Sequence, residues 1–83
     1  MAHDDLIYEV EERAAKASAR YGDFASTHEA LGVALEEWTE LVEAVRSNQL
    51  SAVEYECLDL ASVLVRLARS IRNSASLQSR SIK

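Results

Sequence analysis

The scarcity of helix-breaking residues constrains this chain more than any other feature of its sequence. Its 83 residues include no proline and only two glycines, Gly22 and Gly32. Proline and glycine disfavour helix interiors more strongly than any other residues, so a chain almost without them favours long helices joined by few turns. We therefore expect an all-α fold, with a single helical domain spanning residues 1–83.

Apolar spacing and local end signals predict the first two helices. Apolar residues three and four positions apart indicate a helix over roughly residues 4–20, and Gly22 is expected to end it. A second helix should begin near Ser26, because Ser26 and Glu29 form a capping box, and should continue to about residue 46. Its main apolar stripe is expected to face the core and consists of Leu31, Ala34, Leu35, Trp38, Leu41, Val42 and Val45.

A third helix is expected from residue 51 to about residue 72, opened by a second capping box at Ser51 and Glu54. The turn at residues 47–50 is short, so the second and third helices should be antiparallel neighbours. The Ser-rich residues 73–83 are expected to form a frayed or disordered tail. Thin, Ala-rich stripes leave apolar surface uncovered, which predicts that a homo-oligomer, either a dimer or a tetramer, completes the core of this antiparallel bundle.

Charge and cysteine content argue against several classes of protein. The net charge of −5 disfavours a general nucleic-acid-binding protein. No apolar run approaches the roughly 18 residues that a membrane span requires, and the acidic N-terminus does not resemble a signal peptide. Cys57 is the only cysteine, so no intrachain disulfide can form, and we expect it to be a small core residue. These features predict a cytoplasmic protein with no nucleic-acid or membrane partner.

Four carboxylates occupy helix positions that are normally apolar. On the second helix Glu37 has apolar angular neighbours, and Glu40 lies at the edge of the same face. On the third helix Glu56 projects within the apolar face, and Asp59 lies at its border. A carboxylate on a core-facing stripe is costly unless it is paired or binds a cation. Two such pairs on adjacent antiparallel helices can converge, so we expect a metal site between them.

The donor types indicate which ion this site would hold. Four carboxylates suit a hard cation, Mg²⁺ or alternatively Mn²⁺. Zinc would require His or Cys ligands, and a di-iron site would require Glu-x-x-His motifs, which neither His3 nor His28 supplies. Each Glu-x-x-acid pair taken alone also fits an ordinary solvated helix face. Two pairs on apolar-flanked faces favour the metal.

These carboxylates also form a pattern that resembles a known family. Glu36-Glu37-Trp38-Thr39-Glu40, followed after 15 residues by Glu56-Cys57-Leu58-Asp59, resembles the EExxE…ExxD signature of MazG-type nucleoside triphosphate pyrophosphohydrolases. Residues 27–32 resemble the start of the equivalent helix, and the resemblance covers residues 24–70. It implies Mg²⁺-dependent hydrolysis of a nucleoside or deoxynucleoside triphosphate to the monophosphate and pyrophosphate, a house-cleaning hydrolase activity. It also implies a helical dimer or tetramer.

The resemblance further implies roles for individual side chains. The four carboxylates hold Mg²⁺, and Glu36 lies near a second ion or the attacking water. A glutamate that is not fully committed to metal can accept the water's proton, so Glu36 is the catalytic candidate, although its angle also fits a surface residue. Basic groups beyond the second motif hold the phosphates in the family, and Arg66 and Arg69 are the candidates here. Lys16 on the first helix is a third candidate. Arg20 on the same helix could also reach a phosphate, and for both residues a role in surface solubility is the alternative.

Two other functions remain open. A non-catalytic helical oligomer would keep the acidic cluster to bind a metal ion or nucleotide, as a regulatory or interaction module. A purely structural bundle would pair its carboxylates with arginines across an interface. The position of Glu56 within an apolar face counts against this last alternative.

Overall fold

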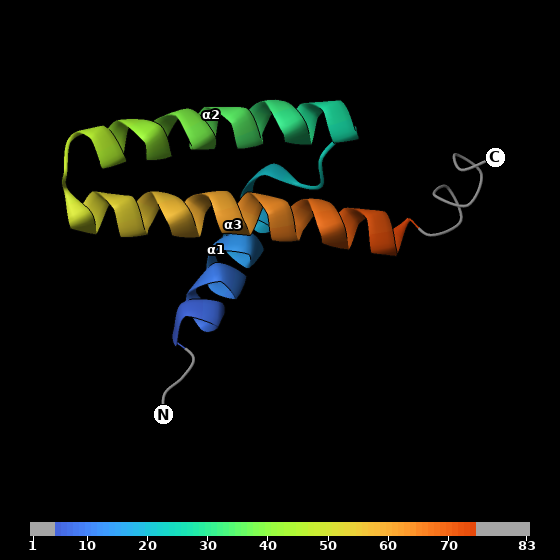
Figure 1. The fold of residues 1–83 in the computed structure, drawn as a ribbon. Helices are drawn as coiled ribbons and strands as arrows, with labels where there is room; N and C mark the ends of the chain where they lie inside the picture. Colours follow the sequence, from blue (N-terminus) through green and yellow to red (C-terminus); the bar gives the residue numbers. More distant parts are fainter. Residues whose placement is uncertain (1–4, 75–83) are drawn as a thin grey trace.

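A computed structural model describes residues 5–74, which form three helices (Figure 1). They are α1 (Asp5–Tyr21), α2 (Thr27–Arg46) and α3 (Leu50–Asn73), with no strand in this part of the chain. The predicted all-α fold is therefore confirmed. Most of the predicted tail, residues 75–83, lies outside the described residues.

The predicted ends of α1 and α2 are confirmed at the atomic level. Gly22 follows α1 with φ +76°, a backbone conformation that glycine adopts without steric cost, and its N–H donates to the carbonyl of Ser18 at 2.8 Å. At the start of α2, Ser26 Oγ accepts a hydrogen bond from the Glu29 N–H at 3.0 Å. Glu29 Oε1 accepts one from the Ala25 N–H at 2.6 Å, so the two side chains pair groups that a helix end leaves free.

The predicted start of α3 is confirmed to within one residue, but the predicted capping box at Ser51 and Glu54 was wrong. The helix begins at Leu50, and its N-cap residue, Gln49, makes no capping hydrogen bond through its side chain. The chain reverses through Asn48, which has φ +58°, a left-handed conformation that asparagine tolerates. Because the turn ends at Gln49, Ser51 lies within the first turn of the helix and cannot be its N-cap residue.

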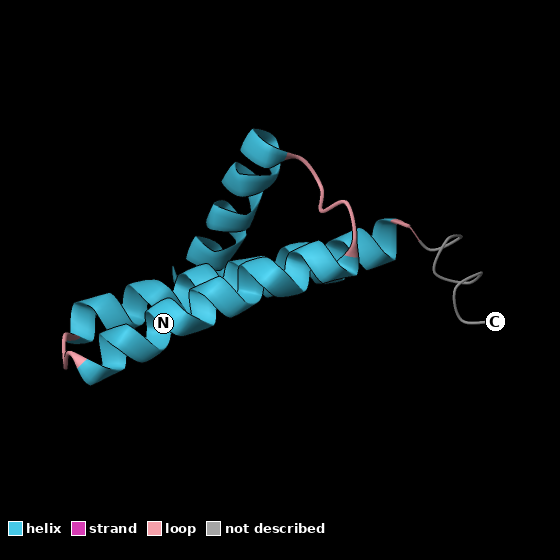
Figure 2. Cartoon of the chain, turned by 90° about the horizontal axis from the view of Figure 1, so that it is seen from above, coloured by secondary structure: helices cyan, strands magenta, loops and turns pink. Residues whose placement is uncertain are grey.

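Both α1 and α2 pack against α3. The α2 and α3 helices lie side by side and antiparallel, as predicted, whereas α1 crosses α3 at a steep angle (Figures 1 and 2). Within the described residues, α1 and α2 pack on α3 but not on each other. A space between α1 and α2 therefore opens above α3.

The face of α2 that meets α3 consists of small residues. Ala30 and Ala44 are buried, and Glu37 lies midway between them at a spacing of seven residues, so all three share one side of the helix. Four of the seven residues of the predicted core stripe instead face outward: Leu31, Leu35, Trp38 and Val45 are between 53% and 55% exposed. The other three, Ala34, Leu41 and Val42, are half-buried. Small side chains permit a closer approach of the two helices, which explains why the alanine face packs inward and the larger residues do not.

Two further findings concern individual residues and membrane spans. Cys57 is exposed, so the prediction that it belongs to the core was wrong: it lies on a side of α3 that neither α1 nor α2 covers. None of the helices described here combines the length and apolar character that a membrane span requires.

Candidate metal centre

The antiparallel pairing of α2 and α3 brings three of the four predicted metal ligands together. One carboxylate oxygen from each of Glu37, Glu56 and Asp59 lies within 4.8 Å of the other two. Glu37 points toward α3 from the alanine face of α2, and Glu56 and Asp59 are one turn apart on α3. Glu40, the fourth predicted ligand, lies one turn after Glu37, is exposed and does not belong to this group of three.

The three carboxylates fit a shared hard cation. Two oxygens that bind the same ion lie at most about 5 Å apart for Ca²⁺ and about 4.2 Å apart for Mg²⁺. The separations in the group of three, within 4.8 Å, meet the limit for Ca²⁺, and a small contraction of the site would meet the limit for Mg²⁺. Every donor is a carboxylate oxygen, which suits Mg²⁺, Mn²⁺ or Ca²⁺ and does not suit zinc or copper.

Burial makes two of these carboxylates unusual. Glu37 Oε1 and Glu56 Oε1 are each shielded from solvent and have no hydrogen-bond partner among the described residues. Desolvation, together with the negative charges of Glu40, Asp59 and Glu56, raises the pKa of Glu37 to about 7. Desolvation, followed by the charges of Glu40 and Asp59, also raises the pKa of Glu56, and the positive charge of Arg13 partly opposes this. Each oxygen thus has an unmet requirement for a proton or a cation.

Arg13 is a site residue that the sequence analysis missed. Its Nη1 donates to Asp59 Oδ1 at 2.6 Å and to the carbonyl oxygen of Tyr55 at 3.1 Å. Its guanidinium also lies over the Tyr55 ring, 4.3 Å from the centroid, a cation–π contact. The only sequence signal for this role is that Arg13 directly precedes Ala14, the buried residue of α1.

A cleft of about 690 Å³ lies beside the carboxylates. Residues of α1 line one side and residues of α2 line the other, with α3 beneath. Glu37 and Asp59 reach the cleft, whereas Glu40 and Glu56 do not. Glu36, the catalytic candidate, is exposed on the α2 side, and Lys16 lies on the α1 side.

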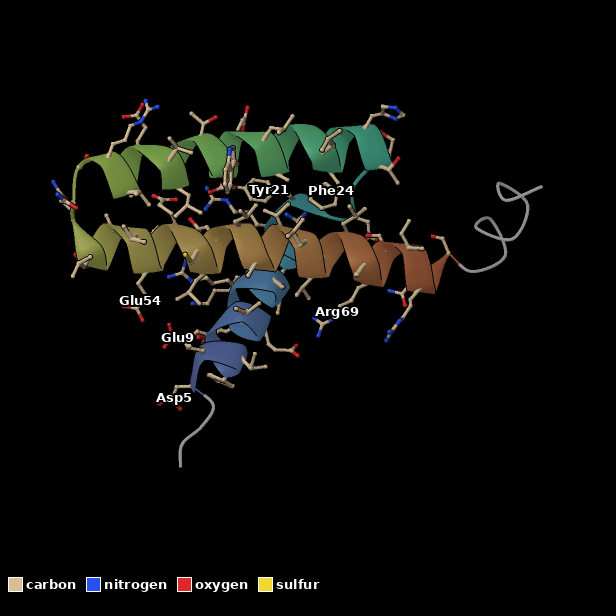
Figure 3. All side chains as sticks on the ribbon, viewed as in Figure 1. Asp5, Glu9, Tyr21, Phe24, Glu54 and Arg69 are labelled. Carbon is tan, nitrogen blue, oxygen red and sulfur yellow. The ribbon has the colours of Figure 1, made fainter. Side chains whose placement is uncertain are left out.

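The two arginines predicted to hold phosphates lie in different surroundings. Arg66 lines the cleft, but its side chain is buried: Nη2 donates to the carbonyl of Gly22 at 3.0 Å, and the guanidinium lies over the Phe24 ring at 4.2 Å. These contacts hold the loop between α1 and α2 against α3. Arg69 pairs with Glu11, does not line the cleft, and projects from α3 on the side away from α2 (Figure 3).

Comparison with known proteins finds no matching family model, no similar curated protein and no similar solved structure.

Proposed function

We propose that this protein is a Mg²⁺-dependent hydrolase that converts a nucleoside or deoxynucleoside triphosphate to the monophosphate and pyrophosphate, acting in the cytoplasm. The observation that carries the proposal is the convergence of Glu37, Glu56 and Asp59 beside a cleft, with two buried oxygens that have no partner. The resemblance of residues 36–59 to the EExxE…ExxD pattern supports the same reaction.

In this proposal the carboxylates of the site have separate roles. Glu37, Glu56 and Asp59 hold Mg²⁺, and Glu40, whose carboxylate lies beside those of Glu37 and Glu56, is the fourth ligand. Bound Mg²⁺ supplies charge neutralisation for the triphosphate and polarises water. Glu36, exposed on the cleft wall, accepts the proton of the attacking water.

We further propose that the active form is a homo-oligomer. The outward stripe of α2 exposes more than half of Trp38 and of three aliphatic side chains, and contiguous apolar surface of this kind marks an association site. Light scattering should therefore report a mass above the 9.2 kDa of one chain. Trp38→Ser should shift the protein toward the monomer, whereas Tyr8→Ser, a change at an exposed residue of α1, should not. A stable wild-type monomer at micromolar concentration would exclude the association.

A non-catalytic module that binds metal or nucleotide is the second candidate function. It is favoured by the Arg13–Asp59 ion pair, because that pair already satisfies one carboxylate of the proposed centre without a metal. In such a module the carboxylate cluster would bind a metal ion or nucleotide without hydrolysing the nucleotide.

Pyrophosphate release from a panel of nucleoside triphosphates with Mg²⁺ tests the enzyme against the module. We expect at least one nucleotide to yield pyrophosphate and the monophosphate. Glu56→Gln should abolish release and the rise in melting temperature that Mg²⁺ causes by binding the folded state. Glu54→Gln is the matched control, because Glu54 lies two residues away and projects from α3 away from α2 (Figure 3). Binding of Mg²⁺ and nucleotide without pyrophosphate release across the panel would favour the module.

A further inference from the structure

The α1 side of the cleft carries a row of positive charges. Arg13, Lys16 and Arg20 are spaced three and four residues apart, which places them on one face of α1, and all three line the cleft. At a rise of about 1.5 Å per residue the row extends about 10 Å along the helix. It begins at Arg13, beside Asp59, and ends next to the loop that follows α1.

The three cations of this row differ in whether they are paired with a carboxylate. Arg13 is bound to Asp59 and to the Tyr55 carbonyl. By contrast, neither Lys16 nor Arg20 forms a salt bridge with any residue that the structure describes. Arg20 makes a cation–π contact with the exposed Tyr21 ring, at 5.4 Å from the centroid. Lys16 and Arg20 thus line the cleft without a salt bridge to a described residue, although Asp23 of the following loop lines the same cleft.

The opposite wall carries charge of the other sign. Glu29, Glu36 and Glu37 line the cleft from α2, yet α2 does not pack against α1. If the cations served only to hold the two helices together, they would pair directly with these carboxylates. The separation of the walls instead leaves room for a ligand that presents negative charge to α1.

We propose that Lys16 and Arg20 form a binding track for a linear phosphate chain that runs along α1 from the metal centre. The proposed function supplies only the identity of the natural ligand, a nucleoside triphosphate, and the inference rests on it to that extent. Arg66 also lines the cleft, but it is not part of the track: Nη2 donates to the Gly22 carbonyl and the guanidinium lies over the Phe24 ring, while its buried Nε has no partner among the described residues. Cations on a flexible stem bind phosphate as point charges, and guanidinium groups bind it in a bidentate manner.

Calorimetric titration with inorganic tripolyphosphate, in the presence of a chelator, tests the track without the metal. The parent protein is the full chain carrying Glu37→Gln and Glu56→Gln, which removes the metal centre and reduces repulsion in the cleft. We expect saturable binding by this parent. Adding Lys16→Gln and Arg20→Gln should weaken it at least about tenfold, the scale of one lost charge-assisted hydrogen bond.

The matched control adds Arg46→Gln and Arg72→Gln to the same parent. These exposed arginines lie outside the cleft, and the change in net charge is identical. The control should retain the affinity of the parent within about twofold, and circular dichroism should report the same helix content in all three proteins. Equal weakening in the control and the Lys16/Arg20 protein, or no saturable binding by the parent, would overturn the track.

Kinetics of the otherwise wild-type protein separate this inference from the proposed hydrolysis. If wild type releases pyrophosphate and Lys16→Gln/Arg20→Gln leaves KM unchanged, the track is wrong and the hydrolase stands. If no nucleotide is hydrolysed but tripolyphosphate binding depends on Lys16 and Arg20, the track stands and the hydrolase is wrong.

Discussion

The two helices that pack on α3 are held there by different forces. The α2 helix contributes two buried alanines and places Glu37 between them, and neither described salt bridge joins it to α3. The α1 helix buries only Ala14, whereas both described salt bridges, Arg13–Asp59 and Arg69–Glu11, connect it to α3. Salt screens exposed ion pairs, whereas apolar packing does not depend on charge. We therefore expect α2, which forms the acidic wall of the cleft, to be attached to α3 more firmly than α1.

The contrast suggests how the cleft works. Metal ligands must be held within a fraction of an ångström, which suits the tightly packed pair of α2 and α3. A wall that holds a flexible phosphate chain tolerates more movement, which suits a helix attached by ion pairs. Four predictions, from the largest expected effect to the smallest, test this division.

The largest effect is expected at Glu36, on the α2 side. Glu36→Gln should lower kcat by roughly 10²–10⁴, the usual contribution of a positioned general base, because the amide cannot accept the water's proton. Mg²⁺ binding, followed by calorimetry, should be unchanged because Glu36 is not among the converging oxygens. Glu43→Gln, at an exposed residue one heptad later on α2, is the control. Unchanged kcat in Glu36→Gln would assign that residue to the surface.

The second effect concerns the packing of the helical pair. Val63 is 5% exposed and lies seven residues after Glu56, on the face of α3 that meets α2, so Val63→Ala should lower the free energy of unfolding by about 1–3 kcal/mol. Leu6→Ala, at a residue of α1 that is 54% exposed, should change it by no more than about 0.5 kcal/mol. Urea titrations of both variants give the comparison. Similar losses in the two variants would mean that α1 packs as firmly as α2.

The parts of this arrangement that the sequence predicted are those set by local chemistry. The short turn before α3 makes α2 and α3 antiparallel, and the three-residue spacing within each carboxylate motif then aligns both motifs on facing sides. Helical periodicity was enough to identify Glu37 as a polar residue on a packed face. The choice of packed face was not predicted, because Leu35 and Trp38 offer more apolar area than the alanines around Glu37. How closely two helix backbones approach depends on the side chains of both helices. The apolar pattern of one helix alone therefore cannot predict it.

The basic wall was harder to predict for a different reason. The partners Arg13 and Asp59 are 46 residues apart, and the pair forms only because α1 crosses α3 at one angle. That angle depends on the loop after Gly22 and on the Arg66 contacts that hold it, none of which has a periodic signal. Lys16 and Arg20 could both be named from the sequence as residues able to reach a phosphate, but only the crossing of α1 over α3 places them together on the cleft.

The third prediction concerns pH in the absence of metal. In the folded protein the pKa of Glu37 is raised from 4.5 to about 7, so the folded state binds more protons than the unfolded state between these values. Stability should therefore fall as pH rises from about 4.5 to 7 and stay low above that, by an amount on the order of 1 kcal/mol after allowance for solvent screening. Thermal melts across this range should show the decline in wild type, a smaller decline in Glu37→Gln, and recovery at about pH 8 when Mg²⁺ is added. A melting temperature that rises through the same window would contradict the buried carboxylate.

The smallest effect is expected at the pair of Arg69 and Glu11, and it tests whether α1 is held by charge. Both side chains are about half exposed, at 49% and 51%, so Arg69→Gln should lower the free energy of unfolding by only about 0.2–1 kcal/mol, and less at high salt. The loss should be local, because α1 can separate from α3 without disturbing α2. Amide hydrogen exchange should accordingly quicken in α1 and stay unchanged in α2. Arg72→Gln, three residues further along α3 and without a salt bridge to the described residues, should leave both helices unchanged. Faster exchange in α2 as well as α1 would show that the three helices open as one unit, and the proposed division between a firm acidic half and an adjustable basic wall would be wrong.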